Sequence, residues 1–261
     1  MVDETVNFLT ASDPFEERYA ALKKKIDNAN HIVFFGGAGV STGSGIPDFR
    51  SANGLYKNMP EGFEYERPED MLSRKCLIAD TANFFRFYRN SLDVRHYEPN
   101  SVHKYLAKLE EIGKMEAVVT QNVDMLHEKA GTKKIYKIHG TAAINRCAAC
   151  GKIYDADAIF DSPDAIPMCT CGGSYIRPNV VLFGEKLPKE QCMGATRAIA
   201  RADLLIVAGT SLSVYPAAGF VNEYVGDLII INQSETPFDR VANIVFREDM
   251  NTIFDRLLAE A

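Results

Sequence analysis

The sequence has 261 residues, and at roughly 150 residues per domain this length predicts one large domain or a large domain carrying a small one. Hydrophobic residues make up 46% and charged residues 25%, a globular composition that excludes a wholly disordered, collagenous or coiled-coil chain. The formal net charge of −6 makes nucleic acids and anionic membranes unfavourable as main partners.

The first expected element is a helix from about Pro14 to Asn28. Asp13 precedes it as a candidate N-cap, Pro14 occupies the first helical position, and Glu16 completes a capping box. The apolar run that follows, 31–35, is too short for a helix and is closed by two glycines, so it predicts a buried strand.

Further short apolar runs predict buried strands along the rest of the chain, at 117–120, 135–138, 204–208, 228–231 and 244–246. Helical patterns precede two of them, at 101–112 and 189–202. Buried strands that alternate with helices indicate an α/β fold with a Rossmann-like, doubly wound parallel sheet.

Two segments interrupt this alternation. Residues 51–98 begin as a polar loop with glycine and proline and become helical around 81–90, and residues 146–175 hold four of the six cysteines with almost no core-sized apolar run. We therefore expect 1–50, 99–145 and 176–261 to form the Rossmann-like domain. The two insertions would form a small second domain, with the module 146–175 as its cysteine-containing part.

The turn after the first strand is rich in glycine, with Gly37, Ala38 and Gly39 at its centre. Such a turn lets the backbone approach a pyrophosphate at a helix N-terminus. Thr42 stands where the dinucleotide fingerprint has its third glycine, and no acidic residue follows a second strand to bind a ribose. A plain tight turn is therefore an equal alternative.

Polar and aromatic side chains follow the glycine turn and the next strand. Asp48, Phe49 and Arg50 could cover a reactive ring or cation and fix a loop over it, or they could form a capped turn. The segment 120–124 ends a strand, where α/β folds place ligands; its amides could bind a carboxamide, or Asn122 or Asp124 could cap the next helix.

His139 is the best general-base candidate among the five histidines, because it ends a predicted strand at the ligand edge and imidazole titrates near neutrality. The other four histidines are expected to have packing, structural or surface roles: His31, His96, His103 and His127.

The spacing of four cysteines predicts a metal site. Cys147 and Cys150 form a Cys-x2-Cys pair, and after 18 intervening residues Cys169 and Cys171 form a Cys-x-Cys pair. Four thiolates suit tetrahedral zinc, and with no open position the zinc would be structural. The N-terminal segment lacks a signal peptide, and no apolar stretch approaches the roughly 20 residues of a membrane span. The expected compartment is the reducing cytoplasm.

Taken together, these motifs resemble those of the sirtuins, the Sir2 family of NAD-dependent protein deacylases, in its bacterial type with structural zinc. The resemblance spans nearly the whole chain and rests on motifs in a common order: 37–42, 46–50, 120–124, 139–140, the four cysteines, 177–185, 209–212 and 214–218. It implies deacylation of protein lysines, with NAD consumed, nicotinamide released and the acyl group transferred to ADP-ribose. It also implies catalytic roles for His139, Asn122 and Asp124, with His139 as the base.

The same resemblance implies the binding residues. Those for NAD are Gly37, Ala38, Gly39, Thr42, Asp48, Phe49, Arg50, Gln121, Asn122, Val123, Asp124, His139, Gly209, Thr210, Ser211, Asn232 and Asp249. Those for an extended acyl-lysine peptide are Val181, Phe183, Gly184, Glu185, Ser213, Val214 and Tyr215. Phe85 and Tyr88 stand where relatives that remove succinyl groups carry Tyr and Arg, so we expect neutral acyl groups to be preferred.

Two alternatives to deacylation stay open at this point. Some sirtuin-like proteins mainly transfer ADP-ribose to a protein, and a non-catalytic NAD-sensing or zinc-ribbon interaction module is a second possibility. The expected partners are acylated-lysine proteins or peptides, with no nucleic acid and no membrane.

Overall fold

A computed structural model describes residues 8–58, 62, 67–213, 215–222 and 224–261. Its larger part is a six-stranded sheet in the order β3-β2-β1-β7-β8-β9, and every neighbouring pair is parallel. The strands are β1 (Ile32–Gly36), β2 (Met115–Thr120), β3 (Ile135–Lys137), β7 (Leu204–Ala208), β8 (Asp227–Ile231) and β9 (Ile244–Phe246). The prediction of a Rossmann-like parallel sheet is confirmed.

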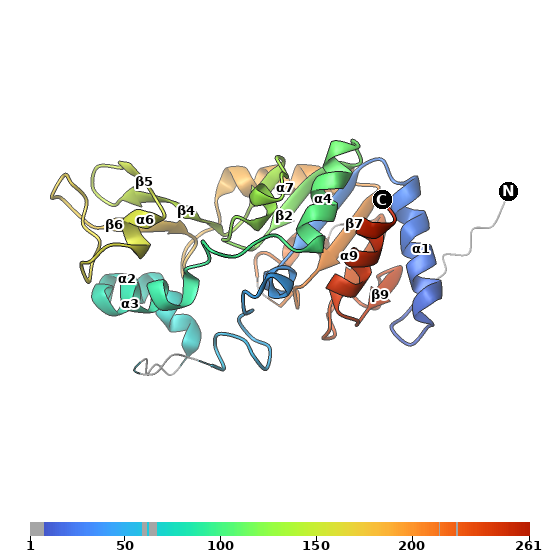
Figure 1. Cartoon of the computed structure of the whole chain (residues 1–261), viewed down its shortest axis with the longest axis horizontal. Coiled ribbons are helices and arrows are strands. Elements are labelled where there is room, and N and C mark those ends of the chain that lie inside the picture. The colour runs from blue at the N-terminus through green and yellow to red at the C-terminus, as the bar shows by residue number, and fades with distance from the viewer. Residues whose placement is uncertain (1–7, 59–61, 63–66, 214, 223) are drawn as a thin grey trace.

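Helices cover both faces of this sheet (Figure 1). One face carries α1 (Phe15–Asn28), α4 (Ser101–Glu111) and α9 (Met250–Ala259), and the other carries α7 (Lys189–Arg201) and α8 (Gly219–Asn222). Successive side chains of a strand point to opposite faces, so Phe34 packs under the first group of helices and Phe35 under the second. This two-sided burial is why the strands read as continuous apolar runs.

The start of α1 differs from the prediction. Its N-cap is Pro14, and no side chain caps it, so the expected capping box is wrong. The carboxylate of Asp13 instead accepts hydrogen bonds from the backbone N–H and the hydroxyl of Thr10, at 2.6 and 2.9 Å. Asp13 is thus engaged by the preceding turn.

A smaller assembly stands beside the large sheet (Figure 1). It contains a three-stranded antiparallel sheet in the order β5-β4-β6, formed by β4 (Gly140–Cys147), β5 (Ile153–Asp155) and β6 (Ile176–Val180). Helices η2 (Pro68–Leu72), α2 (Arg74–Ala79), α3 (Thr81–Leu92) and α6 (Asp157–Phe160) complete it.

Aromatic residues of α3 form the centre of this smaller assembly. Phe84, Phe85, Phe87 and Tyr88 are all fully buried, and they pack with residues of β4, β6 and α6 in one cluster. The two insertions therefore share one core.

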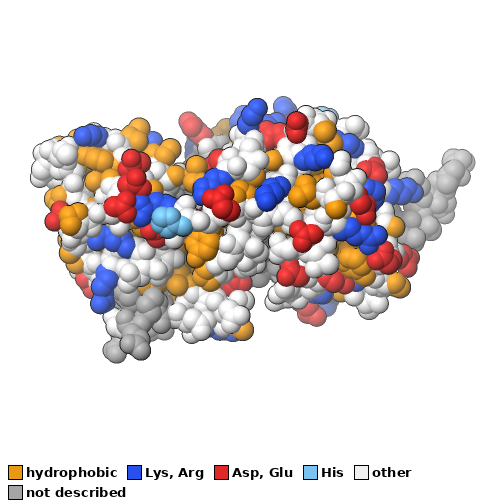
Figure 2. Space-filling view, viewed as in Figure 1, with side chains coloured by type: hydrophobic (Ala, Val, Ile, Leu, Met, Phe, Trp, Pro, Cys, Tyr) orange, Lys and Arg blue, Asp and Glu red, His pale blue; other side chains and the backbone are white. Residues whose placement is uncertain are grey.

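Two short helices remain, η1 (Ala38–Ser44) after β1 and α5 (Leu126–Lys129) after β2. None of the helices in the described ranges is long and apolar enough to cross a membrane. Figure 2 shows acidic and basic side chains intermingled over the face in view, which fits the modest negative net charge.

Candidate active site and metal centre

The candidate active-site residues of the large sheet lie at its carboxyl-terminal edge. The turn 37–42 follows β1, residues 121–124 follow β2, His139 follows β3, and residues 209–211 follow β7. Asn232 follows β8, and Asp249 lies after β9. The chain proceeds from β1 to β2 and β3 on one side and from β7 to β8 and β9 on the other. The space between β1 and β7 is therefore the topological switch point, where open α/β sheets bind ligands.

Glycines allow the two loops at this switch point to touch. Gly39 donates its N–H to the carbonyl of Gly209 at 2.9 Å, and a Cβ on Gly39 would lie only 2.7 Å from Gly209 Cα. Gly209 has φ of 61°, and a Cβ there would lie 2.4 Å from Val40 N. Close backbone packing thus accounts for these glycines, and it places Ala38, the first residue of η1, at the open edge of the sheet.

A buried hydrogen-bond network joins η1 to the segment after β2. The Ser41 hydroxyl donates to Asp124 Oδ2 at 2.8 Å and accepts from Asn122 Nδ2 at 3.0 Å. Asp124 Oδ1 accepts the N–H of Leu126, the first residue of α5, at 3.0 Å, whereas the N-cap of α5 is Met125. Burial raises the pKa of Asp124, while these two hydrogen bonds oppose the rise. Sequence reasoning did not single out Ser41, although it stands inside the glycine-turn motif.

His139 is oriented by the backbone. Its Nδ1 lies 3.0 Å from the carbonyl oxygen of Gln121, an acceptor only, so Nδ1 carries the proton and Nε2 is left as the basic nitrogen. Burial lowers the pKa of His139 below its ordinary value despite this hydrogen bond, so the ring is neutral at pH 7. The side-chain amide of Gln121 donates to the Thr210 hydroxyl at 3.0 Å, which connects the β2 and β7 edges.

The loop after η1 forms a capped turn, which was one of the two alternatives that the sequence allowed for residues 48–50. Asp48 Oδ1 accepts the N–H groups of Arg50 and Ser51 at 3.0 and 2.8 Å. Phe49 lies 5.3 Å from the ring of Tyr56, and the Arg50 guanidinium lies over the same ring. The loop is therefore organised largely by its own residues, and Arg50 also forms an ion pair with Glu69 of η2 at 3.7 Å.

Several candidate NAD residues at the rim have side chains that form hydrogen bonds with residues close to them in the chain. The Thr42 hydroxyl donates to Gly39 O, the Ser211 hydroxyl pairs with that of Ser213, and Asn232 donates to Ser234 O. Asp249 accepts the N–H of Asn251 and so caps α9. Val123 accepts the N–H of Ala142 through its carbonyl.

The candidate peptide segment 181–185 connects the two assemblies. Val181 donates its N–H to the carbonyl of His139 at 2.8 Å. Phe183 pairs with the start of α2, donating to Leu72 O and accepting from Arg74 N, both at 3.0 Å. In the described part of the chain the N–H of Gly184 has no partner. Ser213 and Tyr215 are exposed, whereas Val214 lies outside the described residues.

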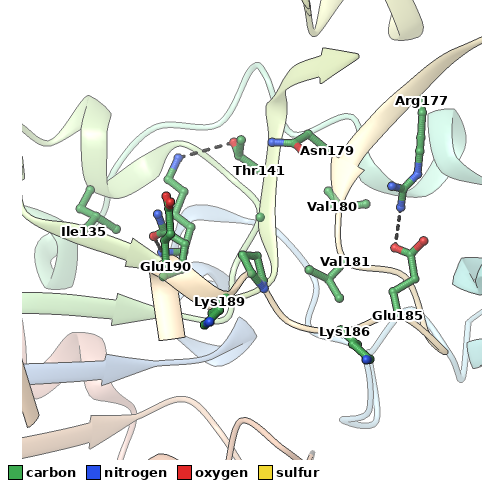
Figure 3. A pocket seen from close by; sticks show the side chains of 14 residues that line it. Ile135, Thr141, Arg177, Asn179, Val180, Val181, Glu185, Lys186, Lys189 and Glu190 are labelled. Carbon is green, nitrogen blue, oxygen red and sulfur yellow. Dashed lines mark hydrogen bonds and ion pairs between the residues drawn. The ribbon is translucent and has the colours of Figure 1, made fainter. Parts of the chain in front are cut away.

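A cavity of about 590 Å³ opens where the two sheets meet, between β3, β4, β6 and the start of α7. Figure 3 shows Arg177 of β6 pointing toward Glu185, with which it forms an ion pair. Glu185 Oε2 also accepts the N–H of Leu182 at 3.0 Å, so this carboxylate holds the loop 182–185 in place.

The four clustered cysteines meet at the end of the small sheet. Their Sγ atoms all lie within 4.8 Å of one another, and the Cys147–Cys171 and Cys150–Cys169 pairs are each 3.7 Å apart. A Zn–S distance of about 2.3 Å in a regular tetrahedron requires sulfurs about 3.8 Å apart, so the four residues fit zinc.

The surroundings of the sulfurs also suit thiolates. Cys147 Sγ accepts the N–H groups of Ala149 and Cys150. Cys169 Sγ lies 3.1 Å from the hydroxyl of Tyr154, and that hydroxyl also accepts the N–H of Thr170 at 3.2 Å. The Tyr154 hydroxyl also lies 3.3 Å from Thr170 Oγ1, and it donates to Cys169 Sγ when that sulfur is a thiolate. These donors stabilise negative charge on sulfur, as a zinc centre requires.

Comparison with known proteins decides the family. Residues 37–216 match the model of the Sir2 family. The chain belongs to the Sir2 family. A Clostridium tetani relative named NAD-dependent protein deacetylase is 43% identical over 240 residues, which cover 92% of this chain and 96% of the relative. A Clostridium acetobutylicum relative with the same name is 45% identical and covers 91% and 96%.

Solved sirtuin structures match this Sir2-family protein over almost its whole length. A complex of a histidine-to-alanine variant of Sir2 with deacetylated p53 peptide and 3′-O-acetyl ADP-ribose has a TM-score of 0.84 at 35% identity, covering 93% of this chain and 98% of the other. A complex of Sir2 with p53 peptide and NAD+ has a TM-score of 0.82 at 35% identity, covering 92% and 97%.

Proposed function

We propose that this Sir2-family protein is an NAD-dependent protein-lysine deacetylase that acts on acylated-lysine proteins and peptides. The observation that carries the proposal is the neutral, backbone-oriented His139 together with the buried network of Ser41, Asn122 and Asp124, both at the carboxyl-terminal edge of the large sheet. The names of the relatives and the peptide and NAD complexes of the solved neighbours support the same activity.

NAD would lie along the carboxyl edge of the large sheet. The fit rests on the donors there, namely the start of η1, the hydroxyls of Thr42, Thr210 and Ser211, and the amides of Gln121 and Asn232. Gly37, Ala38, Gly39 and Gly209 would lie along the pyrophosphate, with Asp48, Phe49, Arg50, Val123 and Asp124 toward the nicotinamide side. Asp249 is proposed as an outer contact. In this arrangement 1–50, 99–145 and 176–261 form the NAD-binding domain, 51–98 the cofactor-binding loop and helical insertion, and 146–175 the zinc module. Strands β4 and β6 extend from the NAD-binding domain into the small sheet that carries the zinc module.

When bound, NAD supplies the acceptor ribose and the nicotinamide leaving group for transfer of the acyl group. His139 would take the proton from the reacting hydroxyl at Nε2, since Nδ1 is held by Gln121 O. Asn122 and Asp124 would fix polar groups of the substrates through amide and carboxylate atoms that Ser41 positions.

The peptide would bind as an added strand between 181–185 and 213–215, a mode that relies on main-chain hydrogen bonds. The unpartnered N–H of Gly184 is a donor for such a strand, whereas the N–H and carbonyl of Phe183 are already paired with η2 and α2. Val181, Phe183, Glu185, Ser213, Val214 and Tyr215 would complete the peptide site.

Zinc held by Cys147, Cys150, Cys169 and Cys171 would have a structural role, because four thiolates leave no position for a substrate. The six cysteines form no disulfide among the described residues, and four of them are grouped as metal ligands. Both observations support a reducing cytoplasm as the compartment.

The test is incubation of the zinc-containing protein with NAD and an acetyl-lysine peptide, with mass spectrometry of all products. Deacetylated peptide, nicotinamide and acetyl-ADP-ribose are expected in equal amounts. His139→Ala should lower the rate by about 10²- to 10⁴-fold, as loss of a general base does. His31→Ala, whose exposed side chain lies at the opposite end of the strands, is the matched control and should keep full activity. Turnover near that of the wild type in His139→Ala would contradict the assignment, and transfer of ADP-ribose to protein would favour the alternative activity.

A further inference from the structure

A second cavity lies between α2 and the candidate peptide segment 181–185. It measures about 430 Å³ and is lined by Arg74, Lys75, Ile78 and Ala79 of α2 together with Phe183 and Gly184. Nothing in the proposed reaction uses it.

The walls of this cavity are fixed to the peptide segment by the backbone. Phe183 donates to Leu72 O and accepts from Arg74 N, each at 3.0 Å, and Ser73 and Phe183 form a parallel bridge. The side chains of α2 therefore keep a constant position relative to Gly184, whose N–H is available to a bound peptide. If a peptide were hydrogen-bonded to the N–H of Gly184, one of its side chains would lie next to this cavity.

The chemistry of the walls is both apolar and basic. Ile78 is 59% exposed and Phe183 is 41% exposed, so two large apolar side chains meet solvent in one small cavity. Arg74 and Lys75 are exposed, and neither side chain forms an ion pair or hydrogen bond with a residue in the described ranges. The neighbouring carboxylate of Glu185 is already engaged by Arg177, so it does not neutralise them. The cavity thus combines an apolar floor with two unpaired cations.

We propose that this cavity is a subsite for a glutamate side chain that flanks the acyl-lysine of the substrate. The methylenes of the glutamate would contact Ile78 and Phe183, and its carboxylate would face Arg74 and Lys75. Charge complementarity selects the acid, because a cationic side chain would meet two like charges. The cavity is open to water, so the expected preference is modest, about 5-fold over glutamine. This inference rests on the proposed peptide site and names a further feature of its substrates.

The experiment is a glutamate scan through an acetyl-lysine peptide of otherwise uncharged sequence. One glutamate is placed at each of several positions before and after the acetyl-lysine, and the matched peptides carry glutamine or lysine there. Equilibrium binding is measured by fluorescence anisotropy and deacetylation by mass spectrometry. Because binding is read without turnover, a protein that failed to deacetylate would refute the proposed function and still report on the subsite.

We expect one position at which glutamate binds about 5-fold more tightly than glutamine, with the gain in KM and not in kcat. Lys75→Glu should abolish that preference and favour the lysine peptide, and Arg74→Gln should reduce it. Lys104→Glu, an exposed lysine of α4, makes the same change of net charge and should retain the preference. Equal binding of all peptides by the wild type, or a glutamate preference that persists in Lys75→Glu, would overturn the proposal.

Discussion

A pair of buried histidines predicts that the protein loses stability in mildly acidic solution. His103 of α4 is 0% exposed and His127 of α5 is 2% exposed, and their ring centroids lie 4.7 Å apart. In the described structure His103 Nε2 and both ring nitrogens of His127 have no hydrogen-bond partner. Burial lowers the pKa of His103 to about 4. Burial also lowers the pKa of His127, and the charges of His103 and Lys137 lower it further.

The sign follows from comparing the two states. In the unfolded chain each imidazole takes up a proton near pH 6.5, whereas folded His103 does so only near pH 4. Below pH 6.5 the unfolded chain therefore binds more protons, and the free energy of unfolding falls as the pH falls. His103 alone accounts for a loss of about 1.3 kcal/mol between about pH 7.5 and pH 5.5. The contribution of His127 has the same sign.

Urea unfolding of the wild type and His103→Gln at these two pH values checks the magnitude. Glutamine suits the third position of α4, where His103 forms a capping box with Asn100, and it does not titrate. The pH-dependent loss should be smaller in the variant by about 1.3 kcal/mol, or about 0.5 M in the urea midpoint at an m-value near 2.5 kcal/mol/M. His31→Gln should behave like the wild type, because His31 is exposed. An equal loss in the wild type and His103→Gln would refute the reasoning.

Three further predictions concern zinc, the buried network and the acyl group. Tyr154→Phe removes the hydroxyl beside Cys169 and should speed zinc loss to a chelator about 10-fold or more, measured with a colorimetric zinc indicator, because such outer contacts tune metal affinity. Ser41→Ala leaves two buried partners unpaired, so it should lower kcat/KM by about 10- to 100-fold in a deacetylation assay and also lower the melting temperature by about 2 °C or more. Acetyl-lysine should be preferred over succinyl-lysine by at least about 10-fold in kcat/KM, since Phe85 and Tyr88, which stand where succinyl-removing relatives carry Tyr and Arg, have no cation to pair with a carboxylate; a preference for succinyl-lysine would contradict this.

The large sheet was predictable because its strands are buried on both faces. The runs at β1, β7 and β8 contain almost no polar residue, and only a parallel sheet between two helical layers hides such strands completely. The first turn of α1 was less predictable. The sequence Asp13-Pro14 is compatible both with an Asp13 N-cap and with the observed arrangement, in which the Asp13 carboxylate accepts hydrogen bonds from the preceding turn.

The small sheet was missed for a physical reason. Its strands alternate between exposed and buried residues and include Asn145, which is fully buried and donates to the carbonyl of Asp155. Strands whose core includes a polar residue and cysteines contain no continuous apolar run, which is the pattern that predicts a buried strand. The cysteine spacing predicted the metal site, but the strands that bring the four sulfurs together form through long-range pairing of β4 with β6.

The sequence could assign a function to a single residue only where that function did not depend on contacts with residues far away in the chain. Asp124 illustrates the limit, because the pattern allowed either a helix cap or a ligand contact, and in the structure Asp124 precedes the N-cap residue Met125 and holds the first N–H of the helix. Oδ1 accepts the N–H of Leu126, whereas Oδ2 is held by Ser41, which lies 83 residues away in the chain. A carboxylate has two oxygens, so one residue can hold the start of a helix and also contribute to a site. The hydrogen bond to the start of α5 positions the Asp124 carboxylate, because it also fixes the direction in which the second oxygen points.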